Sequence, residues 1–332
     1  MIRYIFFFHF FIISFCLLHN SNAQDTLYPP NPSGPTKIYV SLVINNISEV
    51  NAASETIKAD IFFTFKWKDP RLAHNGKRRR MTSTDVSWDP LLTITNRLNI
   101  TKSLPDEPVI LGDGTIIYMQ RVFGEFMQDF ELKNFPMDIQ TFRITLVAIG
   151  ASAEEIEIEP DPEFQSGISD YLKLLDWKIL DWKYDVSPYI FMKGESALPS
   201  ITFSMRAQRE SGFYFLVYVI PLVLIILMSF TVFWLNPELA SSQISIATTS
   251  MLTLIAYRYI VVGSLPKISY FTRMDIFVLG SSILIFITFL QAILTASLMN
   301  KGNKTLAIKI DFYCRWIFPL LYLIVCLIAF VF

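Results

Sequence analysis

The chain contains four long segments without a charged residue, all of them after Glu210. They cover residues 211–237, 239–257, 276–300 and 316–332. A helix that crosses a bilayer needs about 20 predominantly apolar residues, and each segment is close to that length. We therefore predict an all-α transmembrane domain over residues 211–332, with four spans at about 212–235, 241–262, 274–299 and 312–332.

The second span is less uniformly apolar than the others. On a helix with 3.6 residues per turn, its hydroxyl, aliphatic and aromatic residues recur at steps of three and four and share one face. Hydroxyl groups find no hydrogen-bond partner in lipid, but they can be hydrated on a helix that borders a water-filled pore. The alternative is a buried span whose hydroxyls bond back to preceding carbonyl groups. The predicted pore-lining residues are Ser242, Ser245, Thr249, Leu252, Ala256 and Tyr259.

The N-terminus has the composition of a secretory signal peptide. Arg3 precedes an apolar run over residues 5–18, and small residues ending at Ala23 provide a cleavage site. We predict a signal peptide over 1–23, which places residues 24–210 outside the cytoplasm. Four crossings then return the C-terminus to the same side of a plasma or inner membrane, with lipid as a partner.

The exported segment, residues 24–210, reads as β-structure. Short apolar runs are punctuated by Gly, Pro, Asn and Asp, and no helical period competes with them. In one such run Phe63, Phe65 and Trp67 alternate and lie on one face. We predict a mainly-β, immunoglobulin-like sandwich of about ten strands.

Charge and cysteine content exclude several functions. Between Asp25 and Glu210 there are 26 acidic and 20 basic residues, a net charge of −6, and the rest of the chain after Glu210 carries +4. An acidic outer domain attracts cations and excludes nucleic acid as a partner. The cysteines that remain after signal removal, Cys314 and Cys326, lie in the last apolar segment and leave the sandwich without a disulfide. Since metal-ligand spacing, phosphate loops and nucleophile motifs are lacking, we expect neither an enzyme nor a metal or other cofactor.

Six short motifs follow one another along this arrangement of domains. They are Trp67-Lys-Asp69-Pro-Arg71-Leu72, Trp88-Asp-Pro90 with Asn96, Asp113-Gly114-Thr115 with Tyr118, Asn134-Phe135-Pro136-Met137-Asp138, Arg209 before the first span and Leu265-Pro266 after the second. With them the chain resembles the pentameric ligand-gated ion channels, the Cys-loop receptor superfamily. Gln128 and Phe142 replace the two cysteines that flank the Phe-Pro-x-Asp loop there, and the loop between the third and fourth spans is short. Both departures are similar to the prokaryotic branch.

The resemblance implies a homopentamer in which four identical subunits complete the pore around each chain. It also implies that a small-molecule or proton agonist binds between the outer domains of neighbouring subunits and that loops at the domain junction transmit the signal. The tip over 135–137 is apolar and needs a partner surface, so we expect it to press on the membrane domain while Asp138 pairs with Arg209. The predicted coupling residues are Phe135, Pro136, Asp138, Arg209, Pro266 and Lys267.

The ligand site has few clear candidates. This superfamily carries aromatic residues at the positions of Thr95 and of residues 149–151. The chain therefore has fewer aromatic residues for a binding site than is usual there. Aromatic side chains suit a cationic ligand through cation–π contact, although aromatics in strands also serve as core. Amine, carboxylate and proton agonists all stay open. The remaining aromatic candidates are Phe62, Tyr118, Tyr184, Tyr189 and Phe191.

The inner end of the second span, Ser241-Ser242-Gln243, is uncharged, and Glu238 is the acidic residue near it. Leu252 would form an apolar constriction that closes by dewetting. Glu238 and the acidic outer domain favour inorganic cations as the permeant ions, so we predict a cation-selective channel. The alternatives are an anion-selective channel of the same superfamily, which the length of the loop over 234–243 resembles, and a non-conducting sensor anchored by four helices.

Overall fold

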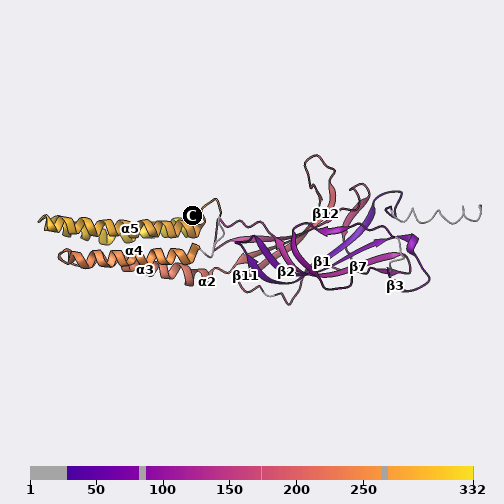
Figure 1. Cartoon of the computed structure of the whole chain (residues 1–332), viewed down its shortest axis with the longest axis horizontal. Helices are drawn as coiled ribbons and strands as arrows, with labels where there is room; N and C mark the ends of the chain where they lie inside the picture. The colour runs from indigo at the N-terminus through magenta and orange to yellow at the C-terminus, as the bar shows by residue number, and fades with distance from the viewer. Residues whose placement is uncertain (1–27, 82–86, 173, 263–267, 332) are drawn as a thin grey trace, which may run out of the picture.

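The computed structural model describes residues 28–81, 87–172, 174–262 and 268–331. The signal peptide predicted over 1–23 and the coupling candidates Pro266 and Lys267 lie outside the described residues. β-Structure occupies one end of an elongated molecule and a helical bundle occupies the other (Figure 1). The predicted combination of a β-sandwich and a four-helix membrane domain is confirmed.

Two sheets form the sandwich from the twelve strands in the described part of the chain. The larger sheet has the order β10-β1-β2-β7-β6-β3, with β5 paired to β7 and β9 paired to β1, and the smaller has the order β11-β12-β8-β4. The strands are β1 (Thr36–Asn51), β2 (Thr56–Lys68), β3 (Arg78–Arg80), β4 (Leu92–Ile94), β5 (Arg97–Lys102), β6 (Val109–Leu111), β7 (Thr115–Met127), β8 (Ile139–Ala148), β9 (Ile156–Pro160), β10 (Gly167–Ile168), β11 (Trp177–Tyr189) and β12 (Leu198–Arg209). Strands of two or three residues carry no alternating pattern, which is why about ten were predicted.

Alternation in β2 shows how the sequence builds the core. Ile57, Ala59 and Ile61 are buried between the sheets, whereas Lys58 and Asp60 on the other face are only partly buried. Full burial of an isoleucine side chain contributes about 1.5–3 kcal/mol, so this face of the strand stabilises the packing of the two sheets. No disulfide is needed to hold the sandwich.

Two of the sequence motifs have structural roles. Asp69 is fully buried and its carboxylate pairs with Arg71, with Arg71 Nε lying 2.8 Å from Asp69 Oδ1. The backbone amide of Asp69 donates to the carbonyl of Gly114, at 2.9 Å. Gly114 has φ +85°, and a Cβ there would lie 2.3 Å from Asp69 O. Glycine is therefore required at this turn.

Four helical segments long and apolar enough to cross a membrane follow Arg209. The first begins with α2 (Gly212–Tyr214), passes through the π-helical turn η3 (Phe215–Val219) and continues as α3 (Ile220–Phe230) and η4 (Thr231–Trp234). The π turn comes directly before Pro221, which has no N–H to donate and so loosens the regular helical pattern. The other segments are η5 (Pro237–Leu239) with α4 (Ala240–Val262), α5 (Arg273–Asn300) and α6 (Lys304–Phe330).

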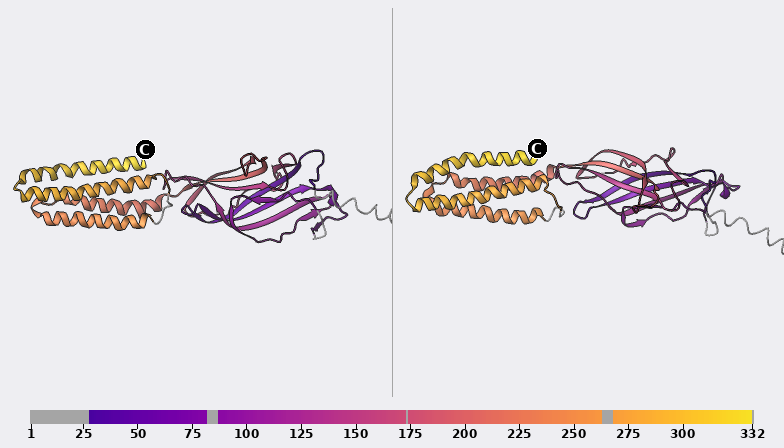
Figure 2. Two further views of the ribbon diagram at one scale, coloured as in Figure 1. Left: turned by 45° about the horizontal axis from the view of Figure 1, so that its top comes forward. Right: turned by 90° about the horizontal axis from the view of Figure 1, so that it is seen from above.

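The helices lie side by side as a bundle (Figure 2). α5 packs against both α4 and α6, and α3 packs against α4 and α5. The C-terminus returns to the end of the bundle that faces the sandwich (Figure 1). Consequently α4 and α6 both begin at the end that lies far from the sandwich.

Candidate functional site: the domain junction and the exposed face of α4

A buried ion pair joins the sandwich to the loop that precedes β8. Arg209 Nε lies 2.7 Å from Asp138 Oδ1, and Nη2 lies 3.1 Å from Oδ2, which makes the contact bidentate. The exposed fractions are 7% for Arg209 and 1% for Asp138. The predicted pairing of these two residues is observed, three residues before the first membrane helix begins at Gly212.

Aromatic rings surround the Arg209 guanidinium. Its central carbon lies 4.2 Å from the ring centroid of Trp177, 5.1 Å from Phe135 and 5.4 Å from Tyr214. Burial alone would lower the pKa of Arg209, but the hydrogen bonds and charge of Asp138 outweigh it and raise the pKa above its usual value. A permanent positive charge is therefore held at the junction.

Glutamine side chains close the loop over residues 128–140, at the place where the Cys-loop superfamily has a disulfide. Gln128 Nε2 donates to the carbonyl of Arg143 at 2.9 Å, and Gln128 Oε1 accepts from the amide of Arg143 at 2.7 Å. Gln140 bonds in the same two-way manner to the backbone of Glu131, at 2.9 and 3.1 Å, and also to Asp138. The loop over 128–140 is thus closed by hydrogen bonds.

The apolar tip of this loop packs on the membrane helices, as predicted. Phe135 is 5% exposed and meets the ring of Tyr214 edge-on, with the centroids 5.0 Å apart. Leu132 and Phe135 share one apolar cluster with Leu222 and Phe277 of the bundle. Pro136 is also buried.

A second set of contacts joins the loop to the segment that leads into α5. The amide of Leu132 donates to Tyr270 Oη at 3.0 Å. The amide of Arg273 donates to the carbonyl of Lys133, and Arg273 Nε donates to Asn134 Oδ1, both at 3.0 Å. The loop therefore contacts the start of the first membrane helix on one side and the start of α5 on the other.

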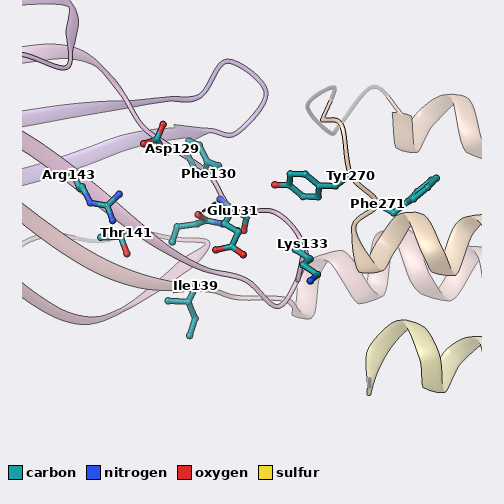
Figure 3. Close-up of a pocket in the computed structure, with 10 residues that line it drawn as sticks. Asp129, Phe130, Glu131, Lys133, Ile139, Thr141, Arg143, Tyr270 and Phe271 are labelled. Atoms are coloured by element: carbon teal, nitrogen blue, oxygen red, sulfur yellow. Dashed lines mark hydrogen bonds between the residues drawn. The ribbon is translucent and has the colours of Figure 1, made fainter. Parts of the chain in front are cut away.

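A cavity of about 520 Å³ lies beside these contacts, between the sandwich and the α4–α5 connection (Figure 3). Both signs of charge are present on its walls, which belong partly to the junction loop and partly to the membrane domain. Movement between the two domains would change its shape. It is lined by Asp129, Phe130, Glu131, Lys133, Ile139, Gln140, Thr141, Arg143, Tyr270 and Phe271.

The predicted pore stripe lies on a face of α4 that no other part of the described chain covers. Leu252 is 63% exposed and Tyr259 is 86% exposed. The other face carries Ala247, Leu254 and Tyr257, which are buried in the bundle. The remaining stripe residues, Ser242, Ser245, Thr249 and Ala256, are likewise exposed.

The hydroxyl groups on this face also bond within the helix. Thr249 Oγ1 donates to the carbonyl of Ser245 at 2.9 Å, and Thr253 Oγ1 donates to the carbonyl of Thr249 at 2.8 Å. Each oxygen keeps lone pairs that can accept from water or coordinate a cation. Back-bonding and a wet face are therefore compatible.

Glu238, the selectivity candidate, forms an ion pair with Lys304 at the start of α6. Both side chains are about half exposed. A neighbouring ammonium group compensates this carboxylate, so Glu238 is not an isolated negative charge. Arg258, beside Tyr259 on α4, is exposed.

The ligand candidates do not gather in one place. In the β2–β7 pair Phe62 lies opposite Arg121, and Phe65 lies opposite Tyr118. Because side chains alternate along a strand, Phe62 and Tyr118 point to opposite faces of the sheet. The two rings therefore do not share one cluster within a single chain.

Tyr118 already faces a cation of its own chain. Lys102 Nζ lies 5.9 Å from the Tyr118 ring centroid and 2.6 Å from Asp106 Oδ2. The hydrogen bond from Lys102, and then that from Tyr118, holds the pKa of Asp106 below its usual value. Tyr118 also stacks on Phe65.

Tyr189 and Phe191 do lie together, at the tip of the β11–β12 hairpin, with ring centroids 4.9 Å apart. Tyr189 lines a cavity of about 390 Å³ that also contains Thr95. Tyr184 lies elsewhere, on the core side of β11, where it lines a small gap beside Phe203. The other charged or polar residues of the Tyr189 cavity are Ser54, Glu55, Asn96, Gln128, Asp129, Arg143 and Thr145.

A β-sandwich whose loop over 128–140 packs on a helical bundle, together with one uncovered polar helix face in that bundle, defines a membrane receptor of the ligand-gated channel type. Residues 17–211 match the neurotransmitter-gated ion-channel ligand binding domain, and residues 218–305 match the neurotransmitter-gated ion-channel transmembrane region. The chain belongs to this family of ligand-gated ion channels and is not an enzyme. It is 23% identical over 308 residues to the proton-gated ion channel of Gloeobacter violaceus, an alignment that covers 91% of this chain and 85% of that protein.

Sequence reasoning missed part of the junction. Trp177 and Tyr214 surround Arg209, and Tyr270 and Arg273 contact the loop, yet none of the four stands in a recognisable motif. Their position next to domain boundaries is the one signal that could have drawn attention to them.

Proposed function

We propose that five copies of this chain form a ring in which α4 lines a pore. The uncovered stripe on α4 carries this proposal, because the exposed hydroxyl groups of Ser245 and Thr249 suit a water-filled pore better than lipid. Rings of hydroxyls at Ser245 and Thr249 replace part of the hydration of an ion. The ring of Leu252 forms the apolar gate.

We propose further that the sandwich and the C-terminus lie outside the cytoplasm, in a plasma or inner membrane. Agonist binding to the sandwich, or protonation of it, favours one arrangement of the helices. Only a difference in affinity between closed and open states can shift that equilibrium. The Arg209–Asp138 pair and the contacts of Phe135, Tyr270 and Arg273 are the route by which the shift reaches the helices.

Cation selectivity is the proposed ion preference. The net charge of −6 between Asp25 and Glu210 concentrates cations at the entrance. The second candidate is an anion-selective channel, which the exposed Arg258 near the outer end of α4 favours. Reversal potentials under dilution of NaCl separate the two: a move toward the chloride potential contradicts cation selectivity.

The proposed pore is tested by Leu252→Ser, recorded in cells that express the full chain. A polar ring at the gate resists dewetting, so we expect larger current without stimulus or half-activation at a weaker stimulus, for example a smaller step in external pH. The matched control is Leu323→Ser, because Leu323 is a similarly exposed leucine (55%) on α6. Equal effects of the two variants, or current from neither variant nor the wild type, would contradict the proposal.

A further inference from the structure

A buried carboxylate lies in the membrane domain, at the end that is far from the sandwich. Asp311 on α6 is 1% exposed. It accepts hydrogen bonds from Gln243 Nε2 of α4 at 3.1 Å, from Thr295 Oγ1 of α5 at 3.3 Å and from Gln291 Nε2 of α5. Among the described residues, no ion pair includes Asp311.

A second observation concerns the two glutamine side chains. Gln243 and Gln291 are 0% and 8% exposed, and the side-chain oxygen Oε1 of each is buried without a hydrogen-bond partner. A buried acceptor without a donor is costly. The cluster therefore contains more acceptors than donors, and one additional proton would correct that imbalance.

The amide groups can serve either form of the acid. Their NH₂ groups donate to a carboxylate, as observed, and their oxygens can accept from the O–H of a protonated acid. An ionisable group inside the membrane region is a candidate functional site when its partners can satisfy more than one state. From this geometry we propose that Asp311, Gln243 and Gln291 form a proton-binding site whose occupancy changes the anchoring of α4.

The link to α4 runs through Gln243. Its Nε2 also lies 3.2 Å from the carbonyl of Val232 and 3.4 Å from that of Leu235, which fastens the first turn of α4 to the end of the preceding helix. When Asp311 takes a proton from solvent, a new O–H bond forms and donates to one of the two free amide oxygens. If Gln243 turns to accept it, its NH₂ leaves the carbonyls, and the first turn of α4 is released.

The charged and titratable groups around the site come from few elements. Arg315, one turn further along α6, donates from Nε to the carbonyl of Phe233 at 2.7 Å, and Cys314 adjoins it. η5 contributes Glu238, which is paired with Lys304. In the described chain α4 and α5 present only amides and hydroxyls to Asp311.

The site is tested directly by pH-difference infrared spectroscopy of the purified full-length protein in lipid vesicles. When the pH is lowered from about 8 to about 5, the wild type should gain a carbonyl-stretching band of a buried carboxylic acid. Free carboxyl groups have pKa values of about 4, so most of them stay ionised over this range. Asp311→Asn should lose this band. The control is Glu238→Gln, which removes an exposed acid at the same end of the bundle and should keep the band.

A band that persists in Asp311→Asn, or a wild type without a titrating band, overturns the proposal. If Asp311→Asn fails to assemble, as judged by its elution in size-exclusion chromatography, Gln243→Leu decides instead. That variant keeps the acid but removes one partner, so the band should shift in frequency, and an unshifted band overturns the role of Gln243.

The effect on gating rests on the proposed function. In inside-out patches of the Leu252→Ser background, acidification of the inner face should change open probability about fivefold or more, as is typical of coupled sites. The double variant with Asp311→Asn should not respond. Equal responses overturn the coupling to α4. If no variant conducts, the proposed channel fails, while the infrared result still decides the proton site.

Discussion

Arg209 at the end of β12 binds Asp138, 71 positions earlier in the chain, through two charge-assisted hydrogen bonds inside the domain junction. The pair is buried, so its desolvation is compensated only while both charges are present. Phe135 lies against the guanidinium and also against Tyr214 of the membrane domain. One ion pair thus fixes the position of the loop that touches the helices.

Removal of either charge should destabilise the junction strongly. We expect Arg209→Gln or Asp138→Asn to cost about 3–5 kcal/mol, because each leaves a buried partner charge unpaired, and the double variant should cost less than the sum. Thermal unfolding of the purified protein measures this. The control is Asp181→Asn, which breaks the half-exposed pair with Arg206 and should leave the unfolding temperature nearly unchanged. Similar effects in both pairs would argue against a special role for the junction.

The Glu238–Lys304 pair predicts opposite shifts of selectivity for its two members. Glu238→Gln should leave a ring of uncompensated Lys304 ammonium groups and move the reversal potential in diluted NaCl toward the chloride potential. Lys304→Gln should release a ring of uncompensated carboxylates and move the reversal potential toward the sodium potential. If neither variant moved the reversal potential, the pair would play no part in ion selection.

Much of the architecture could be predicted because its signals are local. The four spans follow from runs without charge, and the sandwich follows from short alternating runs. The pairing of Asp138 with Arg209 could be predicted because each stands in a motif at the domain boundary. In the Asp113-Gly114 motif, Gly114 has the positive φ that glycine adopts readily in a tight turn.

The remaining features depend on register and on contacts between distant residues. Phe62 and Tyr118 point to opposite faces of the sheet because β2 pairs with β7 in a register that places Phe62 opposite Arg121. This register could not be predicted from the sequence. Lys304 reaches Glu238 only after the bundle has folded. Asp311 stands close to an apolar segment, and nothing in its neighbours along the chain predicts the glutamines around it.

Acid should weaken one ion pair on the larger sheet, between Asp60 of β2 and Arg121 of β7, in a predictable direction. Hydrogen bonds from Arg121, at 2.9 and 2.6 Å, lower the pKa of Asp60 below its usual value. A lowered folded-state pKa contributes stability above the unfolded value of about 3.9, and this contribution is lost as the pH falls through the lower folded value. Asp60→Asn should therefore be less stable than the wild type at neutral pH and equal to it in strong acid. Unfolding temperatures against pH measure the difference, and a gap that widens in acid would contradict this account.

Close packing of α5 on α6 depends on Gly280. A Cβ at this position would lie 2.6 Å from Val325 Cγ1, closer than real Cβ contacts allow. We expect Gly280→Ala to cost about 1–3 kcal/mol through overpacking and to lower the unfolding temperature. Val325→Ala should restore much of that loss in the double variant, because it removes the two methyl groups that the new Cβ meets. Gly212→Ala is the matched control, since no atom lies within 4 Å of a Cβ there. Two results would contradict close contact between α5 and α6 at Gly280. One is an equal unfolding temperature for Gly280→Ala and Gly212→Ala, and the other is the absence of rescue by Val325→Ala.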